Sequence, residues 1–172
     1  MNLTIKSIIT LIIVTSLIFS CQVYGQQSSK YFDFWSDGKW TSEITIYNND
    51  TIPEKDSFIV QKMNDKNAYQ EKWTIFIGEG EYVNATVIRA FDKETNRWKL
   101  FYVDDLNAQT WDSQLLEDKV YFFKEFSFKG KKFYSRQAWS LKTDGRVLRT
   151  IDRSDDNQNW TPRYWQIFKK VD

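Results

Sequence analysis

Apolar and polar residues alternate with a period of two along most of the sequence, and this period limits the fold more than any other feature. The first clear example is residues 40–47, where one side of an extended segment carries Trp40, Ser42, Ile44 and Ile46. The opposite side carries Thr41, Glu43, Thr45 and Tyr47. Because side chains alternate between the two faces of a strand, the pattern predicts a half-buried β-strand rather than an amphipathic helix.

Nine further segments have strand character, and short polar or glycine-containing turns separate them. The ten predicted strands are residues 40–47, 57–63, 68–76, 82–91, 97–103, 108–115, 120–128, 133–141, 147–152 and 164–168. Consecutive hairpins with short turns are typical of an up-and-down meander that closes on itself. We therefore predict an all-β fold, a closed antiparallel up-and-down β-barrel of about ten strands. A β-sandwich is the alternative, although its Greek-key crossings need longer connections.

Aromatic residues make up 17% of the chain, and two stretches concentrate them. Residues 31–40 (YFDFWSDGKW) place two Phe and two Trp around a Ser-Asp-Gly turn, and we expect them to form the floor of the barrel and its first strand. Residues 120–128 (VYFFKEFSF) are aromatic on both faces of a strand. Both faces of that strand should therefore be covered.

The chain contains no histidine, which excludes several classes of chemistry. Ser-His-Asp and Cys-His catalysis, the usual zinc ligand sets and proximal-histidine haem binding all require this residue. The charge is nearly balanced, with 24 Lys and Arg against 23 Asp and Glu, whereas nucleic-acid-binding domains are strongly basic. We predict no cofactor, no metal, no catalytic residue and no nucleic-acid partner, and we regard an enzyme as the less favoured class.

Residues 1–25 have the features of a signal peptide. Residues 7–20 carry no charge, and this apolar stretch is short for a membrane-spanning helix. Residues 23–25 (VYG) fit cleavage before Gln26, whereas residues 18–21 (IFSC) resemble a bacterial lipobox that would place a lipid on Cys21. We expect an exported protein in the periplasm or the medium, or alternatively one that a lipid on Cys21 anchors to the membrane.

The remaining chain divides into a short linker and one domain. Residues 26–30 are polar, and we expect a flexible linker there. Residues 31–172 are long enough for a single barrel domain with a sizeable core. Cleavage before Gln26 would leave no cysteine, so this core would form without a disulfide.

A series of short motifs along the chain resembles one protein family. The first motifs of the series are Phe32-Asp33-Phe34-Trp35, Gly38-Lys39-Trp40 and Glu71-Lys72-Trp73. The later motifs are Asp92, Thr95 and Trp98, then Tyr102-Val103-Asp104, then Arg136, Trp139 and Asp144-Gly145, and finally Ser154, Asp156 and Trp160. In this order they resemble the secreted bacterial family called domain of unknown function 1579, which is similar to lipocalin-like (calycin) barrels. The resemblance covers residues 31–170 and implies a lipocalin-like fold without fixing a function.

Glu71 is the first candidate for a functional residue, because it lies between Tyr69 and Trp73 on one predicted strand face. If that face lines the lumen, Glu71 can bind a ligand amine or hydroxyl, or act as a general acid. The alternative is an internal ion pair with an arginine. Arg136 is then the expected partner, because arginine suits buried carboxylates.

The full set of predicted ligand-binding residues is Trp40, Glu71, Trp73, Trp98, Tyr102, Trp111 and Arg136. Aromatic side chains that face a lumen can line an apolar cavity or stack on a flat ligand, and they can also simply fill the core.

Residues 155–159 (DDNQN) resemble the start of a calcium-binding loop. In such a loop the sixth residue is glycine and the twelfth is glutamate, but here Trp160 and Gln166 occupy these positions. We therefore predict a polar hairpin turn.

The preferred function is a binding module that holds a small apolar or aromatic ligand in the barrel lumen. One alternative is an envelope accessory protein that binds a glycan or a protein partner and assists polysaccharide degradation. The other is a barrel-type isomerase, cyclase or lyase that uses Glu71. We expect a monomer or a homodimer, with membrane attachment only through a lipid anchor.

Overall fold

The computed structural model describes residues 27–63 and 67–171. The predicted signal peptide, the lipidation candidate Cys21 and the first linker residue, Gln26, lie outside the described residues. In the described ranges, strands and turns make up the whole chain. These ranges contain no helix that is long and apolar enough to cross a membrane.

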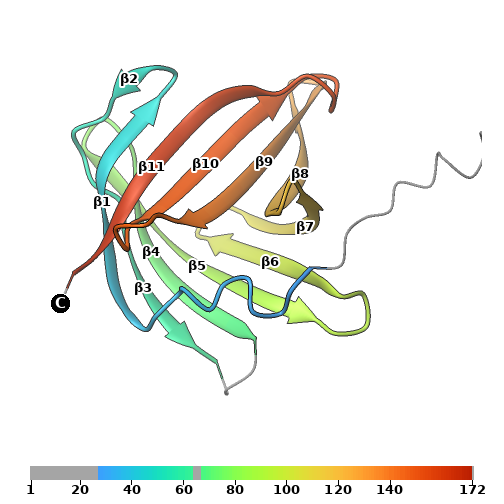
Figure 1. The fold of residues 1–172 in the computed structure, drawn as a ribbon. Helices are drawn as coiled ribbons and strands as arrows, with labels where there is room; N and C mark the ends of the chain where they lie inside the picture. The colour runs from blue at the N-terminus through green and yellow to red at the C-terminus, as the bar shows by residue number, and fades with distance from the viewer. Residues whose placement is uncertain (1–26, 64–66, 172) are drawn as a thin grey trace, which may run out of the picture.

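Ten strands form a closed antiparallel barrel, and one short strand extends it (Figure 1). The barrel strands are β1 (Gly38–Tyr47), β3 (Ser57–Lys62), β4 (Ala68–Gly78), β5 (Glu81–Asp92), β6 (Arg97–Asp104), β7 (Ala108–Leu116), β8 (Lys119–Phe128), β9 (Lys131–Leu141), β10 (Val147–Ser154) and β11 (Thr161–Val171). Each pairs with its neighbour in the sequence, and β11 pairs with β1 to close the barrel. The short β2 (Asp50–Thr51) pairs with the end of β1. The predicted up-and-down barrel is confirmed, and the sandwich is excluded.

Strand β1 departs from strict alternation at a β-bulge. Its register against β11 shifts between Ser42 and Ile44, with Glu43 as the extra residue. Beyond the bulge Thr45 is 3% exposed, whereas Ile44 is 37% exposed. The prediction that Ile44 and Ile46 share the buried face of Trp40 is therefore wrong, because an extra residue reverses which side chains face the core.

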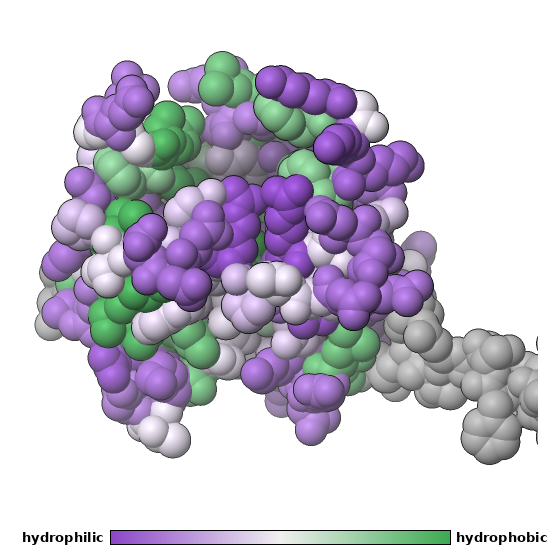
Figure 2. Space-filling view, turned by 90° about the horizontal axis from the view of Figure 1, so that it is seen from above, coloured by the Kyte–Doolittle hydropathy of each residue, from purple (hydrophilic) through white to green (hydrophobic). Residues whose placement is uncertain are grey.

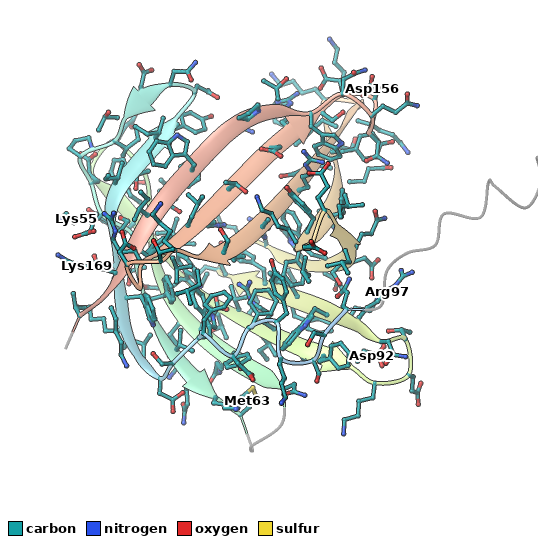
Figure 3. The ribbon with its side chains drawn as sticks, viewed as in Figure 1. Lys55, Met63, Asp92, Arg97, Asp156 and Lys169 are labelled. Carbon is teal, nitrogen blue, oxygen red and sulfur yellow. The ribbon has the colours of Figure 1, made fainter. Side chains whose placement is uncertain are left out.

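The two ends of the barrel differ in how they are covered. Residues 27–37 cross the end that carries the β3–β4 and β5–β6 turns, and we call this the plugged end (Figure 1). Met63 and Asp92 lie toward the plugged end, whereas Asp156 lies at the opposite one (Figure 3). That opposite end, formed by the β1–β2, β4–β5, β6–β7, β8–β9 and β10–β11 connections, is called the open end.

The plug is part of the hydrophobic core. Backbone hydrogen bonds from Tyr31, Asp33 and Trp35 to residues three positions earlier fold it into successive turns. Phe32 is fully buried, and its ring lies 4.8 Å from the Trp98 ring, centroid to centroid, in an edge-on arrangement. This segment therefore forms the floor that the aromatic motif predicts.

Gln27 anchors the start of the plug. It is 3% exposed, and its Oε1 accepts hydrogen bonds from the Trp98 backbone N–H at 2.8 Å and the Ser113 hydroxyl at 2.9 Å. The Trp98 indole N–H donates to the Ser28 carbonyl at 3.0 Å. The expected flexible linker is therefore wrong at Gln27 and Ser28, because a buried amide oxygen and a core indole fix these residues to the barrel.

Strand β8 is covered on both faces over its first half, as its aromatic pattern predicts, but the prediction is wrong at its end, where Phe128 is 66% exposed. Phe122 is fully buried inside the barrel. On the outer face, the Phe123 ring meets the Trp160 ring at 5.7 Å. The connection between β10 and β11 supplies Trp160, so the outer cover comes from a turn of the same chain.

Replacement of Phe32 by Ala tests the plug. We expect the free energy of unfolding to fall by about 3–5 kcal/mol, because the cavity left by a fully buried Phe is lined by rigid strands. Urea unfolding followed by Trp fluorescence would measure this loss. Ile59→Ala is the control, because Ile59 is 53% exposed on the outer face, and its effect should stay within about 0.5 kcal/mol. Equal effects of the two substitutions would show that the plug is not part of the core.

Candidate ligand-binding site

Six of the seven predicted binding residues lie in the barrel interior. Glu71 is fully buried, and the other five belong to the hydrophobic core or pack against it: Trp40, Trp73, Trp98, Tyr102 and Trp111. They do not form one site, however. Trp40 and Trp98 fill the core beside the plug, where their rings meet those of Trp35 and Phe32, whereas the remaining four line a cavity nearer the open end.

Arg136 lies outside the barrel and does not bind Glu71. Its Nε donates to Asp152 Oδ2 at 2.8 Å, and its guanidinium covers the rings of Tyr121 and Trp160. The expected Glu71–Arg136 pair is therefore wrong, because Arg136 follows Ser135 and precedes Gln137, two residues that line the interior cavity.

The partner of Glu71 is Arg89 on β5. Arg89 Nε donates to Glu71 Oε1 at 3.0 Å and Nη2 donates to Oε2 at 3.3 Å. Two indole N–H groups complete the set, from Trp35 to Oε1 and from Trp73 to Oε2, each at 2.9 Å. The carboxylate thus accepts four hydrogen bonds and has no lone pair left for a substrate.

The Arg89 guanidinium sits among aromatic rings. Its Cζ lies 4.8 Å from the Phe32 ring centroid and 5.1 Å from that of Trp139. Burial lowers the pKa of Arg89, and the Glu71 carboxylate opposes this shift. Ring faces and a paired carboxylate together stabilise the charge inside the core.

Two cavities adjoin between this ion pair and the open end. The inner cavity has a volume of about 130 Å³ and lies against Glu71, Arg89, Trp73, Trp111 and Trp139. The outer cavity, about 540 Å³, has mainly apolar walls formed by Ile52, Ile75, Phe76, Ile77 and Ile151. Their walls share Ile75, Tyr102, Arg149 and Ile151, so the two volumes meet at this level.

Seen from above, the open end has strongly hydrophilic residues near its middle, with hydrophobic and hydrophilic residues mixed around them (Figure 2). One polar side chain at the junction of the cavities is Arg149. Its Nη1 donates to Gln166 Oε1 at 3.2 Å and its Nη2 to Gln137 Oε1 at 3.3 Å. The guanidinium also lies over the rings of Trp73 and Trp139, at 5.3 and 5.2 Å. Burial lowers the pKa of Arg149.

Two tyrosines line the outer cavity as neutral groups. Burial raises the pKa of Tyr102, and the hydrogen bond that its hydroxyl donates to Asp104 at 2.6 Å raises it further. Burial also raises the pKa of Tyr164, with the Asp56 carboxylate as the second cause. Both phenols therefore remain protonated at neutral pH and bring no negative charge to Arg149.

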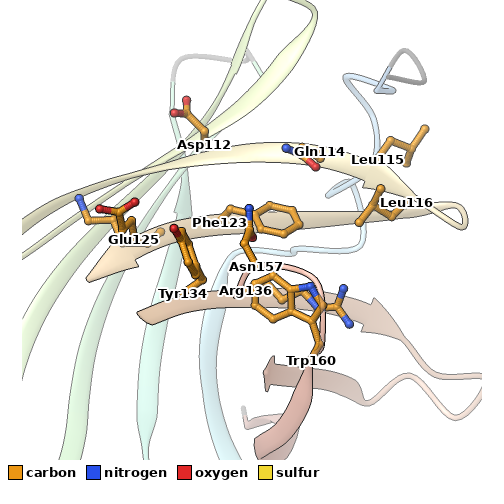
Figure 4. A pocket seen from close by; sticks show the side chains of 11 residues that line it. Asp112, Gln114, Leu115, Leu116, Phe123, Glu125, Tyr134, Arg136, Asn157 and Trp160 are labelled. Carbon is orange, nitrogen blue, oxygen red and sulfur yellow. The ribbon is translucent and has the colours of Figure 1, made fainter. Parts of the chain in front are cut away.

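A separate cleft of about 580 Å³ lies on the outer face of β7, β8 and β9 (Figure 4). Phe123 and Arg136 face Trp160 there, with Asp112 and Glu125 nearby. The Arg136 guanidinium lies 4.5 Å from the Trp160 ring centroid, so internal packing already occupies a face of the indole.

The DDNQN motif forms the polar turn that the sequence predicts. Asp156 Oδ1 accepts hydrogen bonds from the backbone N–H groups of Asn159 and Gln158, each at 2.8 Å, and these donors lower the pKa of Asp156. Among the described residues, no three His, Cys, Asp or Glu side chains gather closely enough to hold a metal ion.

Sequence reasoning missed Arg89 and Arg149, although a signal for both was present. Each arginine has apolar residues two positions before and after it, Val87 and Phe91 for Arg89, and Val147 and Ile151 for Arg149. In a strand, such neighbours lie on the same face as the arginine, so the pattern indicates an arginine that faces the core.

No protein-family model matches the chain, and a search of curated proteins likewise found no match. Membership of the domain of unknown function 1579 family therefore stays a prediction.

A double-mutant cycle tests the central ion pair. Glu71→Gln or Arg89→Met alone should lower the free energy of unfolding by about 3–5 kcal/mol, because each leaves a buried charge without its partner. The double variant contains neither charge, and we expect a coupling energy of at least about 1 kcal/mol in urea unfolding. Lys132→Met is the control, because the Lys132–Glu125 pair is exposed and its loss should leave stability unchanged. Additive effects would contradict the role assigned to the pair.

Proposed function

We propose that this protein is a ligand-binding barrel that holds a small, largely apolar molecule at the open end of its lumen. The observation that carries the proposal is the outer cavity of about 540 Å³, which has apolar walls and continues into the inner cavity. Ligand pockets of proteins are typically of this size, mostly apolar and supplied with a few placed polar groups. Tyr102, Tyr164 and Arg149 provide such groups here.

The packing of the core determines how far a ligand can enter the lumen. Toward the plugged end, Trp35, Trp40, Phe58 and Trp98 are buried and close-packed. A ligand therefore occupies the open half of the lumen and does not reach the plug. Trp111 and Trp73 line the inner cavity and are the residues whose fluorescence should report binding.

The enzyme alternative has less support. A general acid or base needs a lone pair or proton that it can exchange with a substrate. All four hydrogen-bonding positions of the Glu71 carboxylate are taken by Arg89, Trp35 and Trp73.

The envelope accessory alternative has one feature in its favour, the outer cleft with its half-buried Trp160. Sugar rings bind to proteins by stacking on open aromatic faces. Because Arg136 already covers the Trp160 ring, the cleft supports a glycan site less well than the lumen supports a small ligand.

The proposal also includes export of the protein and its membership of the domain of unknown function 1579 family. The uncharged stretch at residues 7–20 supports passage into the periplasm or the medium, with Cys21 as the alternative lipid anchor. The motifs from Phe32 to Trp160 support a relation to the domain of unknown function 1579 family and its lipocalin-like barrels.

Binding of a neutral apolar dye tests the proposed function. N-phenyl-1-naphthylamine should bind saturably, with increased dye emission, because the outer cavity excludes water from an uncharged aromatic molecule. Ile151→Trp should weaken binding at least about tenfold, because the larger side chain fills the junction of the cavities.

Ile59→Trp is the matched control, since it adds the same side chain to the outer face of β3 and should leave dye affinity unchanged. Absence of saturable dye binding, or equal affinity in Ile151→Trp, would rule out the lumen as the binding site.

A further inference from the structure

The inner cavity is rich in hydrogen-bond donors that have no acceptor. Three buried side-chain nitrogens in the described part of the chain make no hydrogen bond, namely Arg89 Nη1, Trp139 Nε1 and Arg149 Nε. All three belong to residues that line this one cavity of about 130 Å³. Buried donors are nearly always paired in native proteins, with protein groups or with ordered water, so unpaired donors on three residues that line one space favour a polar guest there, either water or the acceptor of a ligand.

Two glutamine amides add to this excess. Gln137 Oε1 accepts from Arg149, and Gln109 Oε1 accepts from the Trp111 indole N–H at 3.1 Å. These bonds orient both amides with the oxygen engaged, so the NH₂ group of each is the remaining polar group. Both residues line the inner cavity.

The charge of the cavity wall is also positive. Arg89 and Arg149 face it against the single carboxylate of Glu71. Among the described residues, no carboxylate lies within ion-pair distance of Arg149. Its two hydrogen bonds go to neutral amides.

The carboxylates of Asp56 and Glu71 both oppose the fall that burial causes in the pKa of Arg149, but Asp56 forms no ion pair with it because its oxygens are engaged by other donors. Asp56 Oδ2 accepts from Gln166 Nε2 at 2.7 Å and from the Tyr164 hydroxyl at 3.2 Å, and its Oδ1 accepts from the Phe76 backbone N–H at 2.8 Å. Gln166 thus stands between Asp56 and Arg149, so that the Asp56 charge acts on Arg149 without a direct contact and leaves room for an anion to pair with the guanidinium.

We propose that the inner cavity is an oxyanion pocket and that the ligand is an amphiphile with a carboxylate head. The head binds Arg149 in the inner cavity, and the apolar body lies in the outer cavity against Ile75, Phe76 and Ile151. This inference rests on the proposed function and adds the chemical class of the ligand. A carboxylate suits the site because one unpaired arginine balances one negative charge, and because the guanidinium fork matches carboxylate geometry.

A matched pair of ligands tests the inference on the unaltered protein. Decanoate and decan-1-ol share an alkyl chain and differ in the head group, and displacement of N-phenyl-1-naphthylamine measures both affinities at pH 7.5. Decanoate should bind at least about tenfold more tightly, because hydrogen bonds to a charged group contribute more than neutral ones. Methyl decanoate should bind like the alcohol.

Substitution at Arg149 assigns the preference to one residue. Arg149→Met should abolish the difference in affinity between decanoate and decan-1-ol when both are measured on that variant, whereas Arg149→Lys should retain part of the difference. Arg153→Met is the control, because Arg153 is on the same strand near the open end but lines neither cavity. Decanoate should bind Arg153→Met as it binds the unaltered protein.

The two proposals fail in different ways. Equal affinity for decanoate and decan-1-ol while the neutral dye still binds would overturn the oxyanion pocket and leave the luminal binding site in place. A decanoate preference that survives Arg149→Met would also overturn it. Absence of binding by the dye and by both ligands would overturn the proposed function itself.

Discussion

The buried ion pair between Glu71 and Arg89 connects the plug with two strands of the barrel, β4 and β5. Trp35 of the plug and Trp73 of β4 donate to the carboxylate, and Arg89 reaches it from β5. A fully buried carboxylate is tolerated only when its charge is paired and its lone pairs are satisfied. A hydrogen bond to Glu71, as well as hydrophobic packing, therefore fixes the position of the plug. The position of the plug in turn sets the depth of the lumen.

Aromatic side chains divide the barrel interior into two halves. Near the plug, the rings of Trp35, Trp40 and Phe58 pack with centroid separations of 5.2 to 6.3 Å, which leaves that half filled. Toward the open end, isoleucines and tyrosines replace these large rings, and the interior widens into the two cavities. The aromatic residues beside the plug thus close one end of the barrel.

The sequence predicts the strands well because each carries its own period-two signal and a short turn follows it. The β1 bulge was missed, because Glu43 is an ordinary polar residue in an alternating segment and only the pairing of β1 with β11 shows it as extra. Burial of Gln27 was also missed, since its partners Trp98 and Ser113 are distant in sequence. For the site, the alternation of aromatic residues along the strands correctly predicted six residues that face the barrel interior. Arg89 was overlooked although β5 follows β4 in the predicted meander, because the register that sets Arg89 opposite Tyr69 and beside Glu71 cannot be read from the sequence.

The unpaired donors around the inner cavity connect stability with binding. Each buried donor without an acceptor destabilises the folded state, by about 1–3 kcal/mol for a group of this kind. A barrel selected for stability alone would replace Arg149 by an apolar residue or pair it with a carboxylate, as Glu71 pairs with Arg89. A ligand that supplies the acceptor binds the folded state only, so it must stabilise the protein against unfolding in proportion to its occupancy. Arg149, whose Nε is one of these unpaired nitrogens, is therefore the group through which an anionic ligand would stabilise the folded state.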